Sequence, residues 1–391
     1  MRVLHVIDHI YPQLGYQEFF LAKAHSCVNP TLVISSDRYA KAIFEANKPI
    51  LKEEIVGSGL RKEEGLLILR LPAWFNIPEL NSPWLIGLER EITKFNPHLI
   101  IAHGLVNLSS IRIALAKRKY NKAKLVFDDH MTFNATRGGW TLLLYKIFKL
   151  LLAPIFIKST DFFVAVTPET KNFMSKYYGI PKDSIKVIPL GYSEQNFFKD
   201  SQLRASIRKK YNIKDSEIVL IYAGKIVPEK GVHILVKAAI ELCQKYDNLR
   251  FILIGGNDPD YLQRLKNQIS IARLEGNFII LDAVPNKELC QYYNAADIGV
   301  WPLQCSVTIL EATACGLPTI ISDKSGATER IASGNGLLYR ESDCSDLVEK
   351  IEMLLGSSSR ASLSMKAIEY SQRICWKNLA VEFEKLGHPS T

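Results

Sequence analysis

The residues best suited to chemistry lie in one stretch, Trp301 to Asp323 (WPLQCSVTILEATACGLPTIISD). It reads as the end of a strand, a turn, a short helix stopped by Gly-Leu-Pro, and the next strand. Glu311 stands near the start of the helix, where free backbone N–H groups and a carboxylate would meet at the carboxyl edge of a sheet. That combination suits a phosphorylated nucleotide.

Two interpretations of this helix start are open. In the first, Ser306 or Thr308 caps the helix, backbone amides meet phosphate oxygens, and Glu311 accepts hydrogen bonds from ribose hydroxyls. In the second, Thr308 and Glu311 form a capping box, in which the carboxylate returns to the start of its own helix. The binding candidates in this stretch are Ser306, Val307, Thr308, Ile309, Leu310 and Glu311.

A second group of candidates follows the apolar run from Ile218 to Ala223. The segment AGKIVPEKG supplies Gly224 and Lys225 directly after this run, and Lys230 just before a predicted helix. Two ammonium groups beside a helix start suit the neutralisation of a departing diphosphate. Surface lysines without a role are the alternative.

Glycines follow two other predicted strands. Gly15 in YPQLGYQ would let the backbone approach a phosphate just before the first helix, although a plain tight turn is the alternative. Gly255 and Gly256 end the run from Arg250 to Ile254. The acidic DPD sequence, residues 258–260, comes next and is interpreted as a turn and helix cap and not as a metal site.

Histidines stand at the ends of two strands in the first half of the chain. His130 follows Asp128 and Asp129 in FDDH and could orient a sugar hydroxyl or shuttle a proton. His103 in IIAHG ends the preceding strand. A hydrogen-bonded structural histidine is the alternative for each, but two such residues in one half of the chain favour a cleft there.

Composition narrows the class of partner. The formal net charge is +9, from 49 Lys and Arg against 40 Asp and Glu, which suits an anionic ligand or membrane surface. No nucleic-acid-binding motif accompanies the charge, so no nucleic-acid partner is predicted. The seven cysteines lack CxxC spacing and the eight histidines lack an HExxH pair. The sequence therefore predicts no metal or other cofactor and a reducing, cytoplasmic compartment. The N-terminal MRVLHVIDHIYP is interpreted as a strand and not as a signal peptide.

Short apolar runs alternate with helix-length segments through almost all of the 391 residues. Such runs predict parallel strands buried on both faces, and hence an α/β fold of two doubly wound Rossmann-like domains. The boundary is expected near GYSEQNFFKD, giving domains 1–192 and 193–371. Residues 372–391 contain apolar side chains at helical spacing and are expected to pack back on the first domain.

One segment, residues 140–157 (WTLLLYKIFKLLLAPIFI), is apolar almost all round. Lys146, Lys149 and Pro154 interrupt it, so it falls short of the roughly 20 residues that span a bilayer. It is either a core helix or an interfacial helix that seats the protein on an anionic membrane, helped by the basic residues between 117 and 124.

Taken together and in this order, these segments resemble glycosyltransferase family 4, the retaining nucleotide-sugar transferases with the GT-B fold. The resemblance covers essentially the whole chain. Its marks are AGKIVPEKG, the Gly255–Gly256 pair, YYNAADIGVWP at 292–302, LEATACGLPTIISD at 310–323 and GNGLLY at 334–339. It implies two domains facing a cleft, with the donor on the second domain and the acceptor on the first.

The resemblance also implies roles for single residues. Lys225 stands where the family usually has Arg and Lys230 matches its Lys, so both would bind the donor diphosphate. Glu311 matches the second Glu of the family's EX7E motif and would hold the ribose. His130 would lie near the sugar. The remaining implied residues are Gly15, Gly224, Gly255 and residues 306–310 on the donor side, and His103 and Asp129 on the acceptor side. Lysines and helix dipoles would replace a divalent metal ion.

The chain departs from the family pattern at one position. The first Glu of the motif is replaced by Leu303, and the loop before Glu311 looks about three residues short. Because that Glu contacts the donor sugar in the family, sugar identity is in doubt more than nucleotide binding.

The expected function is retaining transfer of a sugar from a UDP- or GDP-linked donor to a glycan or lipid-linked acceptor hydroxyl, in polysaccharide or glycoconjugate synthesis. The expected location is the cytoplasm, with peripheral attachment to the inner face of the cell membrane. The alternatives are a nucleotide-sugar 2-epimerase of the same fold and a non-catalytic relative that binds a nucleotide sugar.

Overall fold

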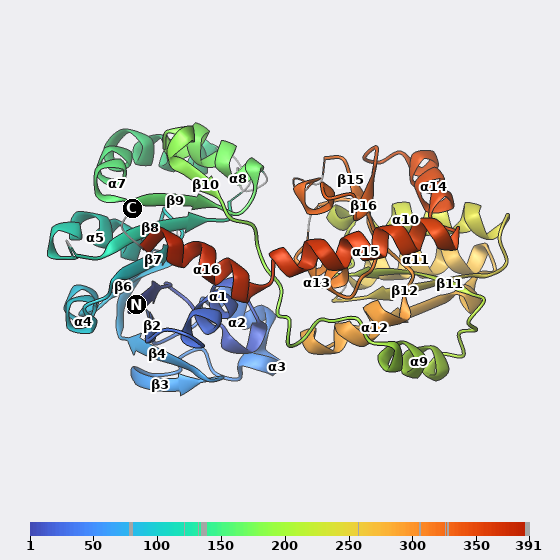
Figure 1. The fold of residues 1–391 in the computed structure, drawn as a ribbon, viewed down its shortest axis with the longest axis horizontal. Coiled ribbons are helices and arrows are strands. Elements are labelled where there is room, and N and C mark those ends of the chain that lie inside the picture. Colours follow the sequence, from blue (N-terminus) through green and yellow to red (C-terminus); the bar gives the residue numbers. More distant parts are fainter. Residues whose placement is uncertain are drawn as a thin grey trace. The chain divides into compact units, whose positions relative to one another are not determined.

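The computed structural model describes residues 1–77, 81–120, 122–131, 133, 139–256, 258–304, 306–324, 326 and 328–387. The chain forms two compact units, shown in Figure 1. The first domain comprises Met1–Leu190 and the residues from Trp376 onward, and the second comprises Gly191–Cys375. The two segments at the second domain's ends pair through a parallel bridge between Tyr192 and Cys375.

The first domain is built on an eight-stranded sheet in the order β10-β9-β8-β7-β1-β2-β4-β3. Its neighbours pair in parallel, except that β3 runs antiparallel to β4, while β5 and β6 form a separate antiparallel pair. The strands are β1 (Val3–Val6), β2 (Thr31–Ser36), β3 (Gly59–Glu63), β4 (Leu66–Leu71), β5 (Ala73–Ile77), β6 (Ser82–Leu85), β7 (Leu99–His103), β8 (Lys124–Asp129), β9 (Phe162–Ala165) and β10 (Ile185–Val187).

Helices cover both faces of this sheet. Successive residues of each strand point to opposite sides, and those on both sides are apolar and need cover. The helices are α1 (Gln17–Ser26), α2 (Lys41–Ala46), α3 (Lys48–Leu51), α4 (Leu88–Phe95), α5 (Leu108–Leu115), α6 (Gly139–Ile147), α7 (Ala153–Ser159), α8 (Pro168–Phe173) and α16 (Trp376–Gly387). Leu4 and Val6 of β1 belong to the core under α4 to α8. Val3 faces α16, which packs against α1 (Figure 1).

The second domain contains a parallel six-stranded sheet in the order β13-β12-β11-β14-β15-β16. Its strands are β11 (Ile218–Ala223), β12 (Leu249–Ile254), β13 (Phe278–Leu281), β14 (Ile298–Trp301), β15 (Thr319–Ser322) and β16 (Gly336–Tyr339). Its helices are α9 (Ser201–Lys210), α10 (Val232–Cys243), α11 (Pro259–Ile271), α12 (Leu289–Ala295), α13 (Thr308–Ala314), α14 (Cys344–Met353) and α15 (Ser357–Arg373).

The two-domain α/β architecture with parallel sheets confirms the fold class predicted from the apolar runs. The order of strands in the second sheet reverses between β11 and β14, since β12 and β13 lie to one side of β11 and β14 to β16 to the other. Ligands of open α/β sheets bind beyond the carboxyl ends of the strands at such a reversal. The residues that follow β11 and β14 are therefore the ones positioned for binding.

Candidate active site

Two glycines bring the ends of β11 and β12 into close contact. Gly224 and Gly255 have φ of 151° and 156°, values that side-chain-bearing residues rarely adopt. A Cβ on Gly255 would lie 1.6 Å from the carbonyl oxygen of Gly224, so only glycine fits there. The hydroxyl of buried Tyr222 donates to the carbonyl of Lys225 at 2.7 Å and holds the turn that presents this lysine.

The segment after β14 is tied to the end of β11. Thr308 Oγ1 donates to the carbonyl of Ala223 at 2.9 Å and lies 2.8 Å from Ser306 Oγ. The indole Nε1 of Trp301 is 3.0 Å from both the Ala223 carbonyl and Thr308 Oγ1. Arg330, a buried residue, donates to the Ser306 carbonyl at 2.6 Å. These bonds fix the start of α13 against the strand end.

Glu311 is a buried carboxylate with one free oxygen. Its side chain is 6% exposed, and Oε1 accepts a 2.8 Å hydrogen bond from Asn286 Nδ2. Among the described residues Oε2 has no hydrogen-bond partner. Burial raises the pKa of Glu311 to about 7, although the Asn286 amide and the hydroxyl of the buried Tyr293 oppose the shift. A ligand hydroxyl that donates to Oε2 would satisfy it.

The capping interpretations of this helix start are wrong. The N-cap of α13 is Val307, and no side chain caps the helix. The Thr308 hydroxyl is engaged with Ala223, and the Glu311 carboxylate with Asn286. The reason is that backbone carbonyls of the turn before α13 already accept the Ile309 and Leu310 amides, which a capping side chain would otherwise bind.

Within that turn, the amide of Ile309 donates to the carbonyl of Ser306 at 3.1 Å and that of Leu310 to the carbonyl of Val307 at 2.8 Å. The amides that keep no partner in the described part of the chain are those of Val307 and Thr308. The amides of Ile309 and Leu310, which were expected to face a phosphate, are therefore already bonded within the turn, and the amides of Val307 and Thr308, two residues earlier, are the ones left for a ligand.

The lysine-bearing loop lies beside Leu303. Lys225 is exposed, and Lys230 ends the 3₁₀ turn Pro228–Lys230. Gly231 follows with φ 71°, and a Cβ there would lie 2.5 Å from Leu303 Cγ. The residue that replaces the expected Glu thus packs against the loop that carries Lys230, and the surface at this point is apolar.

In the first domain the strand-end candidates share one pocket of about 550 Å³. His103, Asp129 and His130 line it together with Tyr16 and Gln17, which directly follow the Gly15 turn. Gly15 has φ 67° and ends the 3₁₀ turn Pro12–Leu14. The structure therefore brings His103, Asp129 and His130 to one pocket, whereas Gly15 itself does not line it.

His103 belongs to a buried chain of three imidazoles. Its Nδ1 lies 2.8 Å from Asp128 Oδ2 and its Nε2 lies 3.0 Å from His5 Nδ1. His5 Nε2 is 3.0 Å from His25 Nδ1, and His25 Nε2 donates to the carbonyl of Ala380 in α16 at 3.1 Å. The Asp128 carboxylate raises the pKa of His103 against the effect of burial, while burial lowers the pKa of His25 to about 4.

The other two candidates differ from each other. Both oxygens of Asp129 accept backbone amides, from Met131 at 2.8 Å and Leu105 at 3.2 Å, so this carboxylate shapes the pocket wall. Burial raises its pKa. His130 is 26% exposed, and its Nε2 lies 3.4 Å from Glu18 Oε1. Both ring nitrogens of His130 are buried, and neither forms a hydrogen bond with a described residue.

One cluster has the spacing of a metal site. Ligand atoms of His103, Asp128 and His130 lie within 4.8 Å of one another. Both ring nitrogens of His103 are already within hydrogen-bond distance of His5 and Asp128, so a metal ion would have to displace one of these contacts. The arrangement fits a hydrogen-bonded network better than a coordination shell.

The apolar segment at 140–157 folds as α6, a single π-helical turn (Phe148–Leu152) and α7. Phe148 and Phe156 are buried in the domain core. The other side exposes a group that we call the leucine patch: Leu143, Ile147, Leu150, Leu151 and Ile157. Lys146, Lys149 and Lys158 are also exposed. The segment is thus buried on one side only, and among the described residues no helix is long and apolar enough to cross a bilayer.

Sequence reasoning missed two residues that touch these sites, Asn286 and Asp8. Asn286 lies in the 3₁₀ turn Asn286–Glu288 before α12 and meets Glu311 only through the fold. Asp8 follows β1 and lines the first-domain pocket. Asp8 could have been predicted from the sequence. It follows β1, and His103 ends β7, which pairs in parallel with β1, so the two strand ends are neighbours.

Comparisons with known proteins match both domains. A family model described as Glycosyltransferase Family 4 matches residues 54–195, and one described as Glycosyl transferases group 1 matches residues 204–373. D-inositol 3-phosphate glycosyltransferase of Nocardia farcinica is 28% identical over 57% of this chain and 51% of its own length. A GDP-mannose-dependent phosphatidylinositol monomannoside mannosyltransferase of Mycolicibacterium smegmatis is 24% identical over 52% of this chain and 55% of its own. The chain thus spans about half the length of these relatives.

The fold is shared with solved structures. The crystal structure of Anabaena HepE in complex with UDP covers 98% of this chain and 99% of its own, with a TM-score of 0.74 and 18% sequence identity. Since the two matched segments, the motifs and the fold agree, the chain belongs to glycosyltransferase family 4 and has the GT-B fold.

Proposed function

We propose that this protein transfers a sugar from a nucleotide-sugar donor to an acceptor hydroxyl on a glycan or a lipid-linked glycan, with retention of configuration. The observation that carries the proposal is Glu311, a buried carboxylate that is fixed by Asn286 through one oxygen and leaves the other without a partner. A buried acceptor without a donor is costly unless a ligand supplies one. Ribose hydroxyls are such donors.

The surrounding groups fit the rest of a nucleotide diphosphate. The unpartnered amides of Val307 and Thr308 and the side chains of Lys225 and Lys230 supply positive charge and hydrogen-bond donors for the phosphates. During transfer they would stabilise the charge that develops on the leaving diphosphate. In the first domain, His130 would contact the transferred sugar, and the pocket beside it would take the acceptor.

Relatives support two donor classes. HepE has been crystallised with UDP, and the Mycolicibacterium relative is named for GDP-mannose. We therefore propose a UDP- or GDP-linked sugar as the donor. The apolar contact between Leu303 and Gly231 replaces an acidic one expected for the family, so the sugar is recognised differently at that point.

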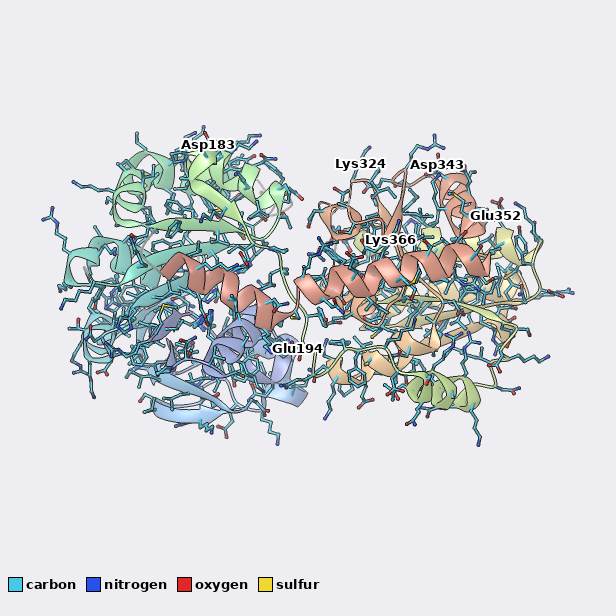
Figure 2. All side chains as sticks on the ribbon, in the orientation of Figure 1. Asp183, Glu194, Lys324, Asp343, Glu352 and Lys366 are labelled. Atoms are coloured by element: carbon cyan, nitrogen blue, oxygen red, sulfur yellow. The ribbon has the colours of Figure 1, made fainter. Side chains whose placement is uncertain are left out.

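A thermal-shift screen tests the nucleotide site. UDP, GDP, ADP and their sugars are added to the native protein, and a nucleotide that binds the folded state raises its melting temperature by several degrees at about 100 times its Kd. Glu311→Ala should lose most of this shift, and Lys225→Ala and Lys230→Ala should reduce it. Glu369→Ala and Lys366→Ala change exposed residues of α15 and serve as controls; Lys366 is labelled in Figure 2.

Failure of every nucleotide to shift the native protein would refute the proposal. If the Glu311→Ala variant shows the same nucleotide-induced rise in melting temperature as the native protein, Glu311 does not belong to the nucleotide site. Adding a chelator tests metal independence, because the lysines should hold the diphosphate without a divalent ion. Product analysis then separates the alternatives: transfer gives a glycoside with the donor's anomeric configuration, a 2-epimerase gives UDP and a 2-epimer without an acceptor, and a non-catalytic relative gives neither.

An exposed surface of the first domain suits contact with a membrane, where a lipid-linked acceptor would lie. The leucine patch, with the exposed Lys146, Lys149 and Lys158, combines apolar side chains with positive charge, as interfacial helices do. Exposed Arg118 and Lys119 add charge in the same domain. We therefore propose that the protein seats itself on an anionic lipid surface, at the inner face of the cell membrane.

A further inference from the structure

Two cysteine side chains of the second domain lie against each other in its core. Cys290 belongs to α12 and Cys315 directly follows α13, both labelled in Figure 1. Their sulfur atoms are 3.8 Å apart, and the two residues are only 3% and 4% exposed. A disulfide joins its sulfur atoms at about 2.05 Å, so this pair has to approach by roughly 1.8 Å to form one.

The surroundings of the two thiols make them unequal. A hydrogen bond with Cys315 lowers the pKa of Cys290 to about 7, against the effect of burial. Burial raises the pKa of Cys315, and the same hydrogen bond adds to that rise. The side-chain Nδ2 of Asn294 lies 3.5 Å from Cys290 Sγ and also favours a thiolate there. Since the thiolate is the reactive form, Cys290 is a nucleophile beside a thiol that can resolve its oxidised product.

A pocket of about 510 Å³ connects the pair to solvent. Cys315 lines this pocket, and so do the exposed residues Lys199, Ser201 and Ala361. An oxidant hardly larger than a water molecule, such as hydrogen peroxide, can therefore reach the sulfur atoms, whereas the bulk of the second domain shields them from larger reagents.

Both cysteines are linked to the hydrogen bond between Asn286 and Glu311. Asn286 precedes Cys290 by four residues, and Glu311 precedes Cys315 by four, with the Cys315 amide donating to the Glu311 carbonyl at 3.3 Å. Residues four apart are neighbours on a helix, so the sulfur pair and the Asn286–Glu311 bond lie one turn apart between the same two segments. Drawing the enclosed sulfur atoms together shifts these closely packed segments and displaces the Glu311 carboxylate.

We propose that Cys290 and Cys315 are a site of oxidative modification, at which hydrogen peroxide joins the two thiols in a disulfide, and that this disulfide weakens nucleotide binding at Glu311. The effect on the nucleotide rests on the proposed function, whereas the disulfide itself does not.

The reaction uses two electrons from the thiols. The Cys290 thiolate attacks one peroxide oxygen, the O–O bond breaks, and the released hydroxide takes up a proton and leaves as water. The Cys315 sulfur then loses its proton and displaces the hydroxyl of the Cys290 sulfenic acid, which leaves as a second water. The peroxide is reduced, the thiols are oxidised, and a dithiol reverses the step by thiol–disulfide exchange.

Peptide mapping by mass spectrometry tests the modification site. The full-length native protein is treated with hydrogen peroxide, the remaining thiols are alkylated, and the protein is digested without reductant. The peptide that contains Cys290 should be joined to the one that contains Cys315, and dithiothreitol should separate them. If both thiols stay free, or are oxidised without a cross-link, at a peroxide concentration that oxidises the exposed Cys27, the site is refuted.

Calorimetric titration with UDP and GDP tests the effect on the nucleotide site. The Kd of the oxidised native protein should be at least about tenfold higher than that of the same sample after reduction, a comparison that needs no variant. Cys315→Ser should bind like the reduced native protein and lose the response to peroxide. Cys27→Ser, at an exposed position of the first domain, should respond as the native protein does. Equal Kd values for oxidised and reduced native protein, or a response that Cys315→Ser retains, overturn the coupling.

Failure of this inference is distinguishable from failure of the proposed function. A protein that binds a nucleotide equally well with and without the disulfide refutes only the inference. A protein that binds no nucleotide even when reduced refutes the proposed transfer, while peptide mapping still decides the modification site. Hydrogen exchange of the α12 and α13 amides then decides the coupling: exchange that is the same in the oxidised and reduced proteins overturns it.

Discussion

Glu311 shows how burial can tune a single residue for binding. An aqueous carboxyl would be ionised at neutral pH, but burial raises the pKa of Glu311 to about 7. A hydroxyl donor binds the ionised form, so ligand binding and deprotonation favour each other. The residue that we propose to recognise the ribose is therefore also sensitive to pH.

This coupling predicts that nucleotide affinity rises with pH. Between pH 8 and pH 6 the fraction of ionised Glu311 falls about tenfold, so the Kd should increase by about tenfold, with up to one proton released on binding. Calorimetry in buffers of different ionisation enthalpy measures both quantities.

Glu311→Gln is the matched comparison, because the nucleotide's own phosphate titrates near pH 6 in both proteins. The variant should bind more weakly and lose the part of the pH dependence that belongs to the carboxyl. Identical pH profiles for the native and variant proteins would contradict the coupling.

The site residues that could be predicted from the sequence are those that lie at or just after the end of a predicted strand. Glu311, His103 and His130 were found because parallel strands place their carboxyl ends at one edge. Asn286 and Asp8 were missed because their partners, Glu311 and Ser82, are 25 and 74 residues away. The capping box failed because a matching tetrapeptide does not reveal that the carboxylate has a competing partner.

At the scale of elements, the segment from α6 to α7 combines two environments. Phe148 and Phe156 anchor it in the core, while Leu150 and Leu151 are 76% and 61% exposed. Apolar residues on both sides explain why the sequence alone could not choose between a core helix and an interfacial one. In the structure, one side of the segment is buried in the domain core and the other is exposed.

The leucine patch predicts binding to anionic vesicles at low salt. Replacing Leu150 and Leu151 together by Glu should reduce the sedimented fraction by at least about tenfold, because two exposed leucines that would enter the membrane are lost and two negative charges are added. Ile271→Glu, at an exposed position of the second domain, is the control for a general loss of apolar surface. A native protein that stays in the supernatant refutes membrane seating.

Elements were predicted well where burial imposes a pattern and poorly where it does not. The buried strands β1, β7 and β8 are continuous apolar runs. Strand β3 has the sequence GLRKE and lies exposed at the edge of the sheet, so it carries no apolar signal. The pair β5 and β6 was also missed. It forms a separate two-stranded sheet, and most of β5 is exposed, so it is not a buried apolar run.

At the scale of the whole molecule, the chain forms two compact domains, each built on its own main sheet. The residues proposed to hold the nucleotide's ribose and phosphates, Glu311, Thr308 and Lys225, all belong to the second domain. Ligand binding to one folded unit stabilises that unit by mass action.

Calorimetric unfolding should therefore show two transitions, of which a bound nucleotide raises one. At 100 times the Kd the stabilisation is about 2.7 kcal/mol, which corresponds to a shift of roughly 5–10 °C for a domain of this size. Glu311→Ala should abolish the shift and leave the other transition in place. A single transition, or equal shifts of both, would contradict this assignment.

The three linked histidines of the first domain share their hydrogens with Asp128 and with the Ala380 carbonyl. Four contacts join the Ala380 carbonyl, His25, His5, His103 and Asp128, and each needs one hydrogen. Three neutral imidazoles supply only three, and neither the carbonyl nor an ionised carboxylate supplies any. The row therefore carries one extra proton, which the Asp128 carboxylate stabilises on His103. The last helix of the chain is thus joined to His103, which lines the first-domain pocket, by a row of four buried hydrogen bonds that ends in the pair His103–Asp128.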